Sequence, residues 1–496
     1  MTAAAATRTT IRDLLDDLLD DGLRSWDAPA GPPPREADTP EYRRALADAR
    51  ARSGADESVL TGEGALHGRR VAVVAGDFAF LAGSIGTGAA TRILEAVERA
   101  TAERLPLIGI TASGGTRMQE GTPAFVRMAG IAAAIADHKS AGLPYVTYLR
   151  HPTTGGVLAS WGSLGHVTLA EPGALIGFLG PKVYAALHGE PFPDGVQRAE
   201  HLHRCGLVDA VVEPENLRDT LARILGLLDA RPSAVRGARG SAEPSAPHPG
   251  AWESVTATRR PDRPGLRELL ALTTDTTLLN ATDAPSASHG AVLALTRIGR
   301  TPCVLFGHDR RAQRSDPPGP GVLRLARRAM GLAAGLGLPL VTVIDTPGAA
   351  LSPEAEEQGT AREIAECLAT MAQLETVSVS VVLGQGTGGA ALALLPADRT
   401  VAAKHAWITP LPPEGASAIL HGTTDKAPEI AEWQQIRAID LLRHGVVDVV
   451  VADDPDPRFP ASMIGAIEEQ LHIARAAPPS ARRAARRRRW RGLPPM

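Results

Sequence analysis

The chain has 496 residues, of which 44% are hydrophobic and 3% aromatic, and its formal net charge at pH 7 is -3. A chain of this length exceeds what one hydrophobic core usually supports, so we expect at least two domains. The composition is that of an ordinary globular protein and points to no function. The three cysteines, Cys205, Cys303 and Cys367, include no CxxC pair, which argues against a disulfide framework and a thiolate zinc site and fits a reducing cytoplasm.

Residues 1–64 are predicted to form an N-terminal helical docking segment. A first helix precedes the Pro-rich connector "APAGPPP", and "TPEYRRALADARARS" is predicted as a second helix. No basic stretch is followed by an apolar one, and the aspartates of "IRDLLDDLLDDGL" argue against a signal or transit peptide. We therefore expect a cytoplasmic location.

Residues 65–230 are predicted to form a first domain. Within "RRVAVVAGDFAFLAGSIG" we expect two short strands joined by Gly76 and Asp77, and "TGAATRILEAVERATAER" has apolar residues at helical spacing. The segments "LPLIGI" and "LPYVTYL" are predicted as buried strands, each followed by a glycine loop and a helix. This alternation indicates βαβ crossovers, with helices packed against a sheet.

A second domain, residues 264–478, is predicted to repeat the plan of the first. "LPLIGITASGG" at Leu105 matches "LPLVTVIDTPG" at Leu338, and "TGG" at Thr154 recurs at Thr387, 233 residues later in both cases. The matches indicate a divergent internal duplication. The intervening residues 231–263, rich in Pro, Gly, Ser and Ala, are predicted to be a linker.

Two further segments bear on membranes and nucleic acids. The longest uncharged run, residues 376–397, is broken by glycines in its middle, so we expect strand, loop and helix there and no membrane contact. Residues 479–496 include "ARRAARRRRWRGLPPM", with seven arginines and no acid. Such a tail could hold RNA, but we predict a solvated, disordered tail and no nucleic-acid partner.

Four glycine loops follow the predicted buried strands. Glycine there lets backbone N–H groups face a ligand, because no Cβ blocks the approach. The loops are Ser113-Gly114-Gly115, Thr154-Gly155-Gly156, Asp345-Thr346-Pro347-Gly348 and Thr387-Gly388-Gly389. Each TGG precedes a helix of small residues, whose free N–H groups would favour a developing oxyanion. Two loops in each half predict two oxyanion holes per chain, as a reaction of two carbonyl substrates would use.

The motifs resemble, in order, those of the carboxyltransferase of acetyl-CoA carboxylase. The first half resembles the bacterial β subunit through "FAFLAGSIGTGAATRI", "SGGTRMQEG" and "PTTGGVLASWGSLGHVTLAEPGALIGFLGPKV". The second half resembles the α subunit through "PLVTVIDTPGA", "AEEQGTAREIAECLATM" and "GQGTGGAALAL". The resemblance covers most of Val71 to Val451. It implies an α/β fold of two tandem crotonase-like domains built from ββαβ units, the first on the acyl-CoA side and the second on the carboxybiotin side.

The resemblance also implies a reaction. A carboxyl group would pass from carboxybiotin, borne on a carrier protein, to acetyl-CoA, giving malonyl-CoA, or to a related acyl-CoA. Gly114 and Gly115 would hold the thioester oxygen, and Gly388 and Gly389 the ureido oxygen of biotin. Further substrate contacts are expected at Gly83, Ser84, Gly86, Gly155, Gly156 and Gly348. No side-chain base is expected, since in the family's chemistry the biotin ring itself takes the acyl proton.

Partners follow from the same resemblance. A biotin carboxylase and a biotin carboxyl carrier protein are expected, together with at least a homodimer, because both glycine sites must serve one cleft. Since the fused halves also resemble the acyl-CoA carboxylase β chains of actinobacteria, acetyl-CoA is one of several candidate substrates. Two other functions stay open, a biotin-dependent acyl-CoA decarboxylase and a non-catalytic or RNA-binding relative.

The chain departs from the family's pattern in two places. The bacterial β subunit usually opens with a four-cysteine zinc ribbon, whereas no cysteine precedes Cys205, so we expect no zinc. Ala350 stands where the α subunit typically has tyrosine, and residues 351–354 replace a more glycine-rich loop. The sequence therefore does not predict which residues of this loop contact biotin.

Several charged residues have two interpretations each. Arg117 and Glu120 could contact CoA or pair with one another, and we favour the pair because "TRMQEG" begins a helix. His308, Arg310 and Arg311 fit either CoA phosphates or a solvated turn. Glu414 in "PPEG" is expected to be a cap or turn residue.

Overall fold

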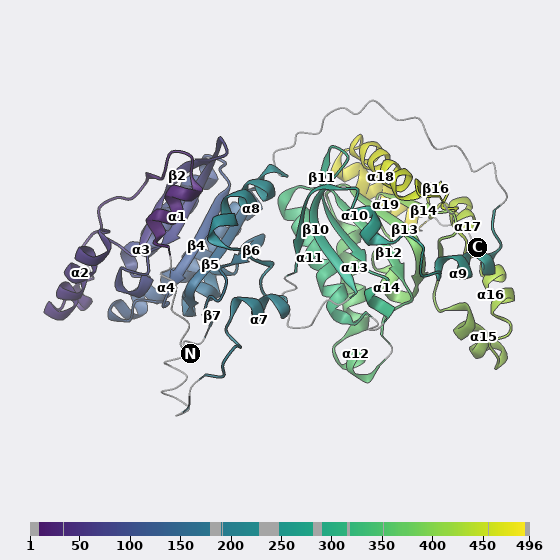
Figure 1. Cartoon of the computed structure of the whole chain (residues 1–496), viewed down its shortest axis with the longest axis horizontal. Coiled ribbons are helices and arrows are strands. Elements are labelled where there is room, and N and C mark those ends of the chain that lie inside the picture. The colour runs from purple at the N-terminus through teal and green to yellow at the C-terminus, as the bar shows by residue number, and fades with distance from the viewer. Residues whose placement is uncertain are drawn as a thin grey trace. The chain divides into compact units, whose positions relative to one another are not determined.

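The computed structural model describes residues 9–32, 34–178, 190, 192–227, 248–280, 290–314, 318–350, 352–454 and 456–491. The chain divides into two compact units, Met1–Gly226 and Leu227–Met496, called unit 1 and unit 2 below. Each unit is built on one mixed sheet with helices packed against it (Figure 1). Within the described ranges, no helix has the length and apolar character needed to cross a membrane.

The sheet of unit 1 has the order β1-β2-β3-β4-β5-β6-β8, with β7 paired to β5. Strands β1, β2 and β3 pair antiparallel, and β3 to β6, β7 and β8 pair parallel. The strands are β1 Arg24–Ser25, β2 Val59–Leu66, β3 Arg69–Gly76, β4 Leu107–Ser113, β5 Tyr145–Thr154, β6 Val167–Ala170, β7 Ile176–Gly177 and β8 Ala210–Val211.

The sheet of unit 2 has the matching order β16-β14-β13-β12-β11-β10-β9, with β15 paired to β13. Its strands are β9 Thr274–Leu279, β10 Ala291–Ile298, β11 Thr301–His308, β12 Leu340–Thr346, β13 Ser378–Thr387, β14 Arg399–Ala403, β15 Trp407–Thr409 and β16 Val449–Val451. Strands β4 and β12 hold the same place in the two sheets, and their sequences are 233 residues apart. The structure thus confirms the internal repeat.

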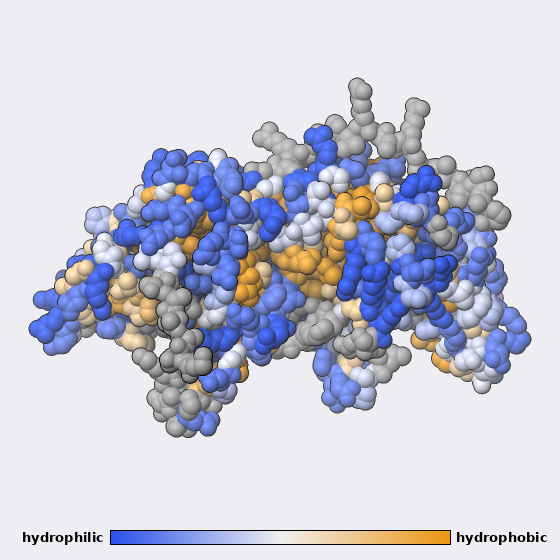
Figure 2. Space-filling view, in the orientation of Figure 1, coloured by the Kyte–Doolittle hydropathy of each residue, from blue (hydrophilic) through white to orange (hydrophobic). Residues whose placement is uncertain are grey.

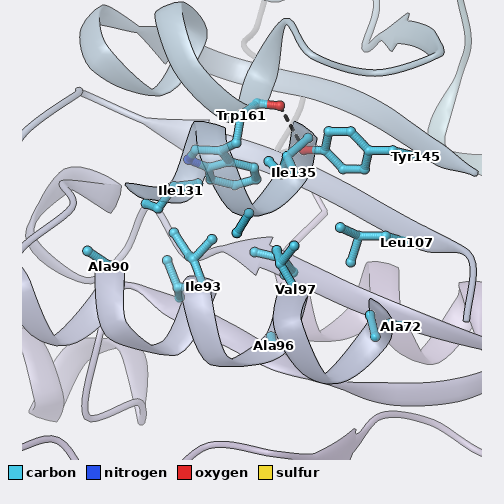
Figure 3. Close-up of a cluster of buried hydrophobic side chains, with 14 of the residues drawn as sticks. Ala72, Ala90, Ile93, Ala96, Val97, Leu107, Ile131, Ile135, Tyr145 and Trp161 are labelled. Atoms are coloured by element: carbon cyan, nitrogen blue, oxygen red, sulfur yellow. Dashed lines mark hydrogen bonds between the residues drawn. The ribbon is translucent and has the colours of Figure 1, made fainter. Parts of the chain in front are cut away.

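Helices α3 and α4 of unit 1 pack on β3, β4 and β5 through a cluster of small and branched side chains. Apolar residues of α3 recur at helical spacing, from Ala89 and Ile93 to Val97 and Ala100, and all are buried. Figure 3 shows the cluster, in which the hydroxyl of Tyr145 donates to the carbonyl of Trp161 at 2.7 Å. The helices of unit 1 are α1 Ile11–Leu18, α2 Pro40–Ser53, α3 Thr87–Ala102, α4 Gly121–Ser140, α5 Gly155–Val157, α7 Ala199–Arg204 and α8 Pro214–Gly226.

Unit 2 repeats this packing with α11 and α13, and adds helices after its sheet. The helices are α9 Ala251–Thr258, α10 Leu266–Leu270, α11 Pro320–Leu336, α12 Pro353–Glu357, α13 Thr360–Gln373, α14 Gly388–Leu392, α15 Pro413–His421, α16 Ala427–Trp433, α17 Ala438–Arg443, α18 Phe459–Arg475 and α19 Pro479–Arg491.

The predicted pair of strands around Gly76 and Asp77 is wrong. Strand β3 ends at Gly76, and its antiparallel partner is β2, which lies largely inside the segment expected to be helical. The alternation of β2 is hidden by two glycines in "VLTGEGAL". They are required by packing, because a Cβ at Gly62 would overlap the carbonyl of Arg24 and one at Gly64 would press on Leu19.

The predicted linker is partly structured. Its residues 231–247 lie outside the described residues, whereas Ala251–Thr258 form α9. That helix buries Ala251 and Val255 against Trp407, Ala431 and Ile436. The Pro- and Gly-rich composition of the preceding residues concealed this short amphipathic helix.

The prediction of a disordered tail is wrong for residues 479–491, which form α19, while residues 492–496 lie outside the described part of the chain. Arg486 contacts the buried carboxylate of Asp398 at 3.2 Å, and Arg489 contacts Asp448 at 2.9 Å. These arginines lie on one face of the helix because they are spaced by about one turn. Carboxylates of unit 2 therefore pair with one face of a segment that composition alone assigned to solvent.

Candidate active site

Two glycine loops of unit 1 lie side by side at one end of its sheet. Strands β4 and β5 are parallel, and their register places Ser113 opposite Thr153, so the loops that follow both strands begin at the same edge. A Cβ built on Gly115 would lie 3.6 Å from the Cα of Gly155 and 3.7 Å from the nitrogen of Gly156. The structure therefore brings together the two glycine pairs that the sequence placed 41 residues apart.

The N–H groups of these glycines are not equivalent. Gly114 donates to the carbonyl of Ala82 at 2.9 Å, and Gly155 donates to that of Phe178 at 3.1 Å. The N–H of Gly115 donates to the hydroxyl of Ser113 at 3.0 Å. The N–H of Gly156, in the first turn of α5, has no acceptor among the residues that the structure describes. In this geometry the available donor is Gly156, and the expected donor Gly114 is already used.

Ser113 has a structural contact on each side. Its hydroxyl accepts from Gly115 and donates to the carbonyl of Gly83 at 2.5 Å. A serine in a nucleophile elbow has a glycine two residues before it, and the chain has Thr111 at that position. Both observations indicate a structural role for Ser113. The hydroxyl holds the loop.

Gly83, Ser84 and Gly86, which the resemblance placed in contact with substrate, pack behind the loop. A Cβ at Gly83 would overlap the carbonyl of Ala112, and one at Gly86 would overlap Glu120. The carbonyl of Ser84 accepts from the guanidinium of Arg117 at 2.8 Å. Close packing therefore explains both glycines, against backbone at Gly83 and against side chains at Gly86.

Arg117 and Glu120 form the predicted ion pair, in a buried cluster with Glu57 and Tyr42. The guanidinium of Arg117 contacts Glu120 at 3.3 Å and also pairs with Glu57. Burial acts to raise the pKa of Glu120, but hydrogen bonds from the backbone of Thr87 and from Tyr42 outweigh it, and the net pKa is lowered. The favoured interpretation is confirmed, and Arg117 is fully occupied within the fold.

A cavity of about 300 Å³ adjoins this cluster. It is lined by residues 28–32, by side chains of α2, α3 and α4, and by residues directly before β2 and α4. The charged lining residues are Arg50, Arg92, Arg117, Arg127, Asp56, Glu57, Glu95 and Glu120. Cations and carboxylates are equal in number there. The lining therefore offers no net positive charge for a diphosphate.

Unit 2 has an equivalent pair of loops after β12 and β13. A Cβ at Gly348 would lie 3.5 Å from Cγ2 of Thr387, and the N–H of Gly348 donates to the hydroxyl of Thr346 at 3.2 Å, as Gly115 does to Ser113. Gly388 and Gly389 open α14, and their N–H groups have no acceptor in the described part of the chain. Unit 2 thus presents two adjacent available donors.

The residues of "GHDRR" do not form a phosphate site. His308 is fully buried, and burial lowers its pKa to about 4, so the ring is neutral at pH 7. Arg310 is buried and donates to the carbonyl of Thr258 at 2.7 Å. Arg311 is exposed and pairs with Glu268 at 2.6 Å. The solvated-turn interpretation therefore holds for Arg311 alone.

Two other predicted positions lie near the loops of unit 2. Glu414 is in the first turn of α15 and pairs with Arg259, so it is a helix-start residue as expected. Ala350 donates its N–H to the carbonyl of Pro318 at 3.0 Å, Leu351 lies outside the described residues, and Ser352 caps α12.

Asp345 was missed as a functional candidate. Its carboxylate is fully buried at the end of β12 and accepts a hydrogen bond from the N–H of Gln385 at 3.1 Å. A signal existed in the sequence, because the duplication aligns this acid with Ala112 of the first half. Metal ligation is a different matter. Nowhere in the described ranges do three His, Cys, Asp or Glu side chains gather as a metal site would require.

Known proteins are similar to this chain in sequence and in fold. The carboxyl transferase domain family matches residues 35–477. The probable biotin-dependent acyl-coenzyme A carboxylase beta3 subunit of Mycobacterium tuberculosis is 53% identical over 500 residues, covering 98% of this chain and 99% of that protein. The acetyl-coenzyme A carboxylase carboxyl transferase subunits beta/alpha of Saccharopolyspora erythraea are 39% identical over 462 residues, covering 90% and 81%.

Solved structures agree on the fold. Transcarboxylase 12S, a hexamer crystallised with hydrolyzed methylmalonyl-coenzyme A, superposes with a TM-score of 0.75 at 22% identity, covering 95% of this chain and 90% of that one. The fold is therefore the predicted α/β fold of two tandem crotonase-like domains. With a family match over most of its length and paired glycine loops in both sheets, the chain belongs to the carboxyl transferase family and is a carboxyltransferase of a biotin-dependent acyl-CoA carboxylase.

Proposed function

We propose that the chain transfers the carboxyl group of carboxybiotin, carried by a biotin carboxyl carrier protein, to acetyl-CoA, giving malonyl-CoA, or to a related acyl-CoA. The observation that carries this proposal is the recurrence in both sheets of two adjoining glycine loops with available N–H donors. Such donors stabilise negative charge that develops on a carbonyl oxygen. The named relatives support both an acyl-CoA and an acetyl-CoA substrate.

Unit 1 is proposed to bind the acyl-CoA. The N–H of Gly156 would donate to the thioester oxygen, and Gly115, whose backbone lies against Gly156, would donate a second bond once Ser113 releases it. This assignment replaces Gly114, whose N–H is held by Ala82. Oxyanion donors in a preorganised loop favour the enolate over the thioester.

Unit 2 is proposed to bind the biotin ring. The available N–H groups of Gly388 and Gly389 fit an acceptor such as a ureido oxygen, and Gly348 adjoins them. When bound, the biotin ring supplies the carboxyl group and accepts the acyl proton. The residues of the chain hold the ureido oxygen and orient the ring, which fits the lack of a carboxylate dyad in the loops.

We further propose that the chain acts as at least a homodimer in the cytoplasm, with a biotin carboxylase as partner and a role in fatty-acid synthesis. Exposed apolar side chains support self-association. They include Phe125 of α4 in unit 1 and Ile419 and Trp433 of α15 and α16 in unit 2, where the last two are 73% and 71% exposed. Figure 2 shows apolar residues on the surface over α15. The hexamer of transcarboxylase 12S is consistent with such assembly.

The test is carboxyl transfer by the purified chain. A biotinylated carrier domain is first charged with labelled bicarbonate by a biotin carboxylase and freed of nucleotide. It is then mixed with the chain and with acetyl-, propionyl- or longer acyl-CoA. The proposal predicts label in at least one carboxylated thioester, dependent on the chain. Loss of label as CO2 without thioester product would contradict it.

A further inference from the structure

Asp345 is a buried carboxylate directly before the loop Thr346–Gly348. Its Oδ1 accepts from the N–H of Gln385 at 3.1 Å, and its Oδ2 faces Nε of Arg310 at 3.6 Å. Burial raises the pKa of Asp345, whereas the nearby Arg310 acts to lower it, and a buried polar group is costly unless it is hydrogen-bonded. The position therefore needs a reason beyond packing.

The carboxylate fills an irregularity between β12 and β13. The pairing passes from Ile344 opposite Val382 to Thr346 opposite Gly386, so Asp345 faces three residues of β13. One of them, Gly384, has no room for a Cβ, which would overlap the carboxylate. Asp345 thereby fixes the course of β13 immediately before Thr387, Gly388 and Gly389.

Two arginines contact this irregularity, Arg263 from the segment that follows α9 and Arg310 from the turn after β11. Arg310 donates to the carbonyl of Thr258 at 2.7 Å while facing Asp345. Arg263 donates to the carbonyl of Leu383 at 2.8 Å and pairs with the buried Asp453. Both ends of the irregular turn in β13 are thus bonded to charged side chains.

Unit 1 forms the same irregularity with other charged residues: Glu171 accepts from the N–H of His151 in the bulge at 3.0 Å and faces the buried Arg150 at 3.9 Å. The pairing there shifts between Thr111 and Ser113, and the positions equivalent to Asp345 and Gln385 are Ala112 and Pro152. Alanine has no carboxylate, and proline has no N–H to donate. A buried carboxylate therefore bonds the bulged strand in both units, and in unit 2 it comes from β12 itself, directly before the loop Thr346–Gly348.

We propose that Asp345 is a positioning residue that aims the N–H groups of Gly388 and Gly389 at the ureido oxygen of biotin, with the guanidinium of Arg310 facing its carboxylate at 3.6 Å. This inference rests on the proposed role of unit 2. Unit 1 is proposed to bind a thioester whose long CoA moiety holds it in place. The biotin ring arrives on a mobile carrier, so its donors gain most from a rigid strand end.

The test compares Asp345→Ala and Asp345→Asn with Asp398→Ala. Asp398 is another buried carboxylate of unit 2, located before β14 and bonded to α19. The first readout is hydrogen exchange of the peptide covering residues 383–387. The second is the kcat for transfer from malonyl-CoA to free biotin, measured beside the dissociation constant of CoA.

The inference predicts that Asp345→Ala speeds exchange in residues 383–387 and lowers kcat with biotin by roughly tenfold to a hundredfold, with CoA affinity unchanged. Asparagine keeps an oxygen for the N–H of Gln385, so Asp345→Asn should restore most of the exchange protection and turnover. Asp398→Ala should lower the melting temperature without either effect.

Exchange in Asp345→Ala equal to that of the wild type would overturn the inference, as would kinetics that match Asp398→Ala. A wild-type chain that transfers no carboxyl group would instead contradict the proposed function. Exchange would still decide whether Asp345 orders the strand end.

Discussion

Replacing Gly156 with proline removes one proposed donor and leaves the other bonds of the loop in place. Gly156 lies in the first turn of α5, where proline is tolerated because that N–H makes no intrahelical bond. No described residue accepts from this N–H, so the change breaks no hydrogen bond within those ranges. An added Cβ would lie 3.1 Å from the hydroxyl of Thr116, which must yield by a few tenths of an ångström. We therefore expect a folded variant with a small shift in melting temperature.

Its turnover should fall sharply. Loss of one oxyanion donor typically lowers kcat by about 10²–10³, or about 2.7–4 kcal/mol in the barrier. The loss should appear in kcat and not in the dissociation constant of CoA, because other contacts hold the CoA moiety. Gly156→Ala is the matched control, since it adds the Cβ and keeps the N–H. A folded Gly156→Pro with near-normal kcat, or an alanine variant that loses as much as the proline one, would refute the reasoning.

Three further predictions follow from the described contacts. Ending the chain at Pro478 removes α19 and leaves Asp398, whose side chain is 4% exposed, without its partner Arg486. Breaking a buried pair usually costs about 3–5 kcal/mol, so thermal unfolding should begin at lower temperature. An unchanged unfolding curve would contradict a stabilising role of α19. Ser113→Ala should cost about 1–3 kcal/mol of unfolding free energy, because its bonds to Gly83 and Gly115 are lost; chemical denaturation measures it, and wild-type stability would disprove the role. Burial lowers the pKa of His308 from its ordinary value of 6.5 to about 4. Between these two pH values the unfolded chain binds a proton on this histidine and the folded chain does not, so the free energy of unfolding is unaffected above pH 6.5 and falls as the pH decreases towards 4. The decrease amounts to about 3 kcal/mol, and His308→Leu should flatten the acid limb of a pH titration of unfolding, whereas an unchanged limb would count against it.

Much of the fold could be predicted because its signals are local and repeated. The strands before Ser113 and Thr346 are continuous apolar runs between glycine and helix signals, and the offset of 233 residues predicted two matching sheets. Strand β2 was not predicted because two glycines interrupt its alternation of apolar and polar residues. The glycines leave room for Arg24 of β1 and for Leu19, which directly follows α1. Helix α19 was not predicted because the acids that pair with its arginines, Asp398 and Asp448, lie far away in sequence.

The site was predictable in its parts but not in its donor assignment. Sequence motifs located all four glycine loops. Which N–H groups are available depends on contacts such as that of Gly114 with Ala82, and no spacing rule reports them. The same limit applies to Asp345, whose partner Gln385 is identified only when β12 and β13 are aligned.

The most direct measurement is a structure of the chain with a non-hydrolysable acyl-CoA analogue. The account predicts that the oxygen standing for the thioester carbonyl accepts a hydrogen bond from Gly156, at about 2.9 Å from its nitrogen. Gly115 should be its neighbour, and Gly114 should remain bonded to Ala82. An analogue whose carbonyl oxygen lies at the loops of unit 2, or that contacts the hydroxyl of Ser113 while Gly156 stays without a partner, would contradict the account.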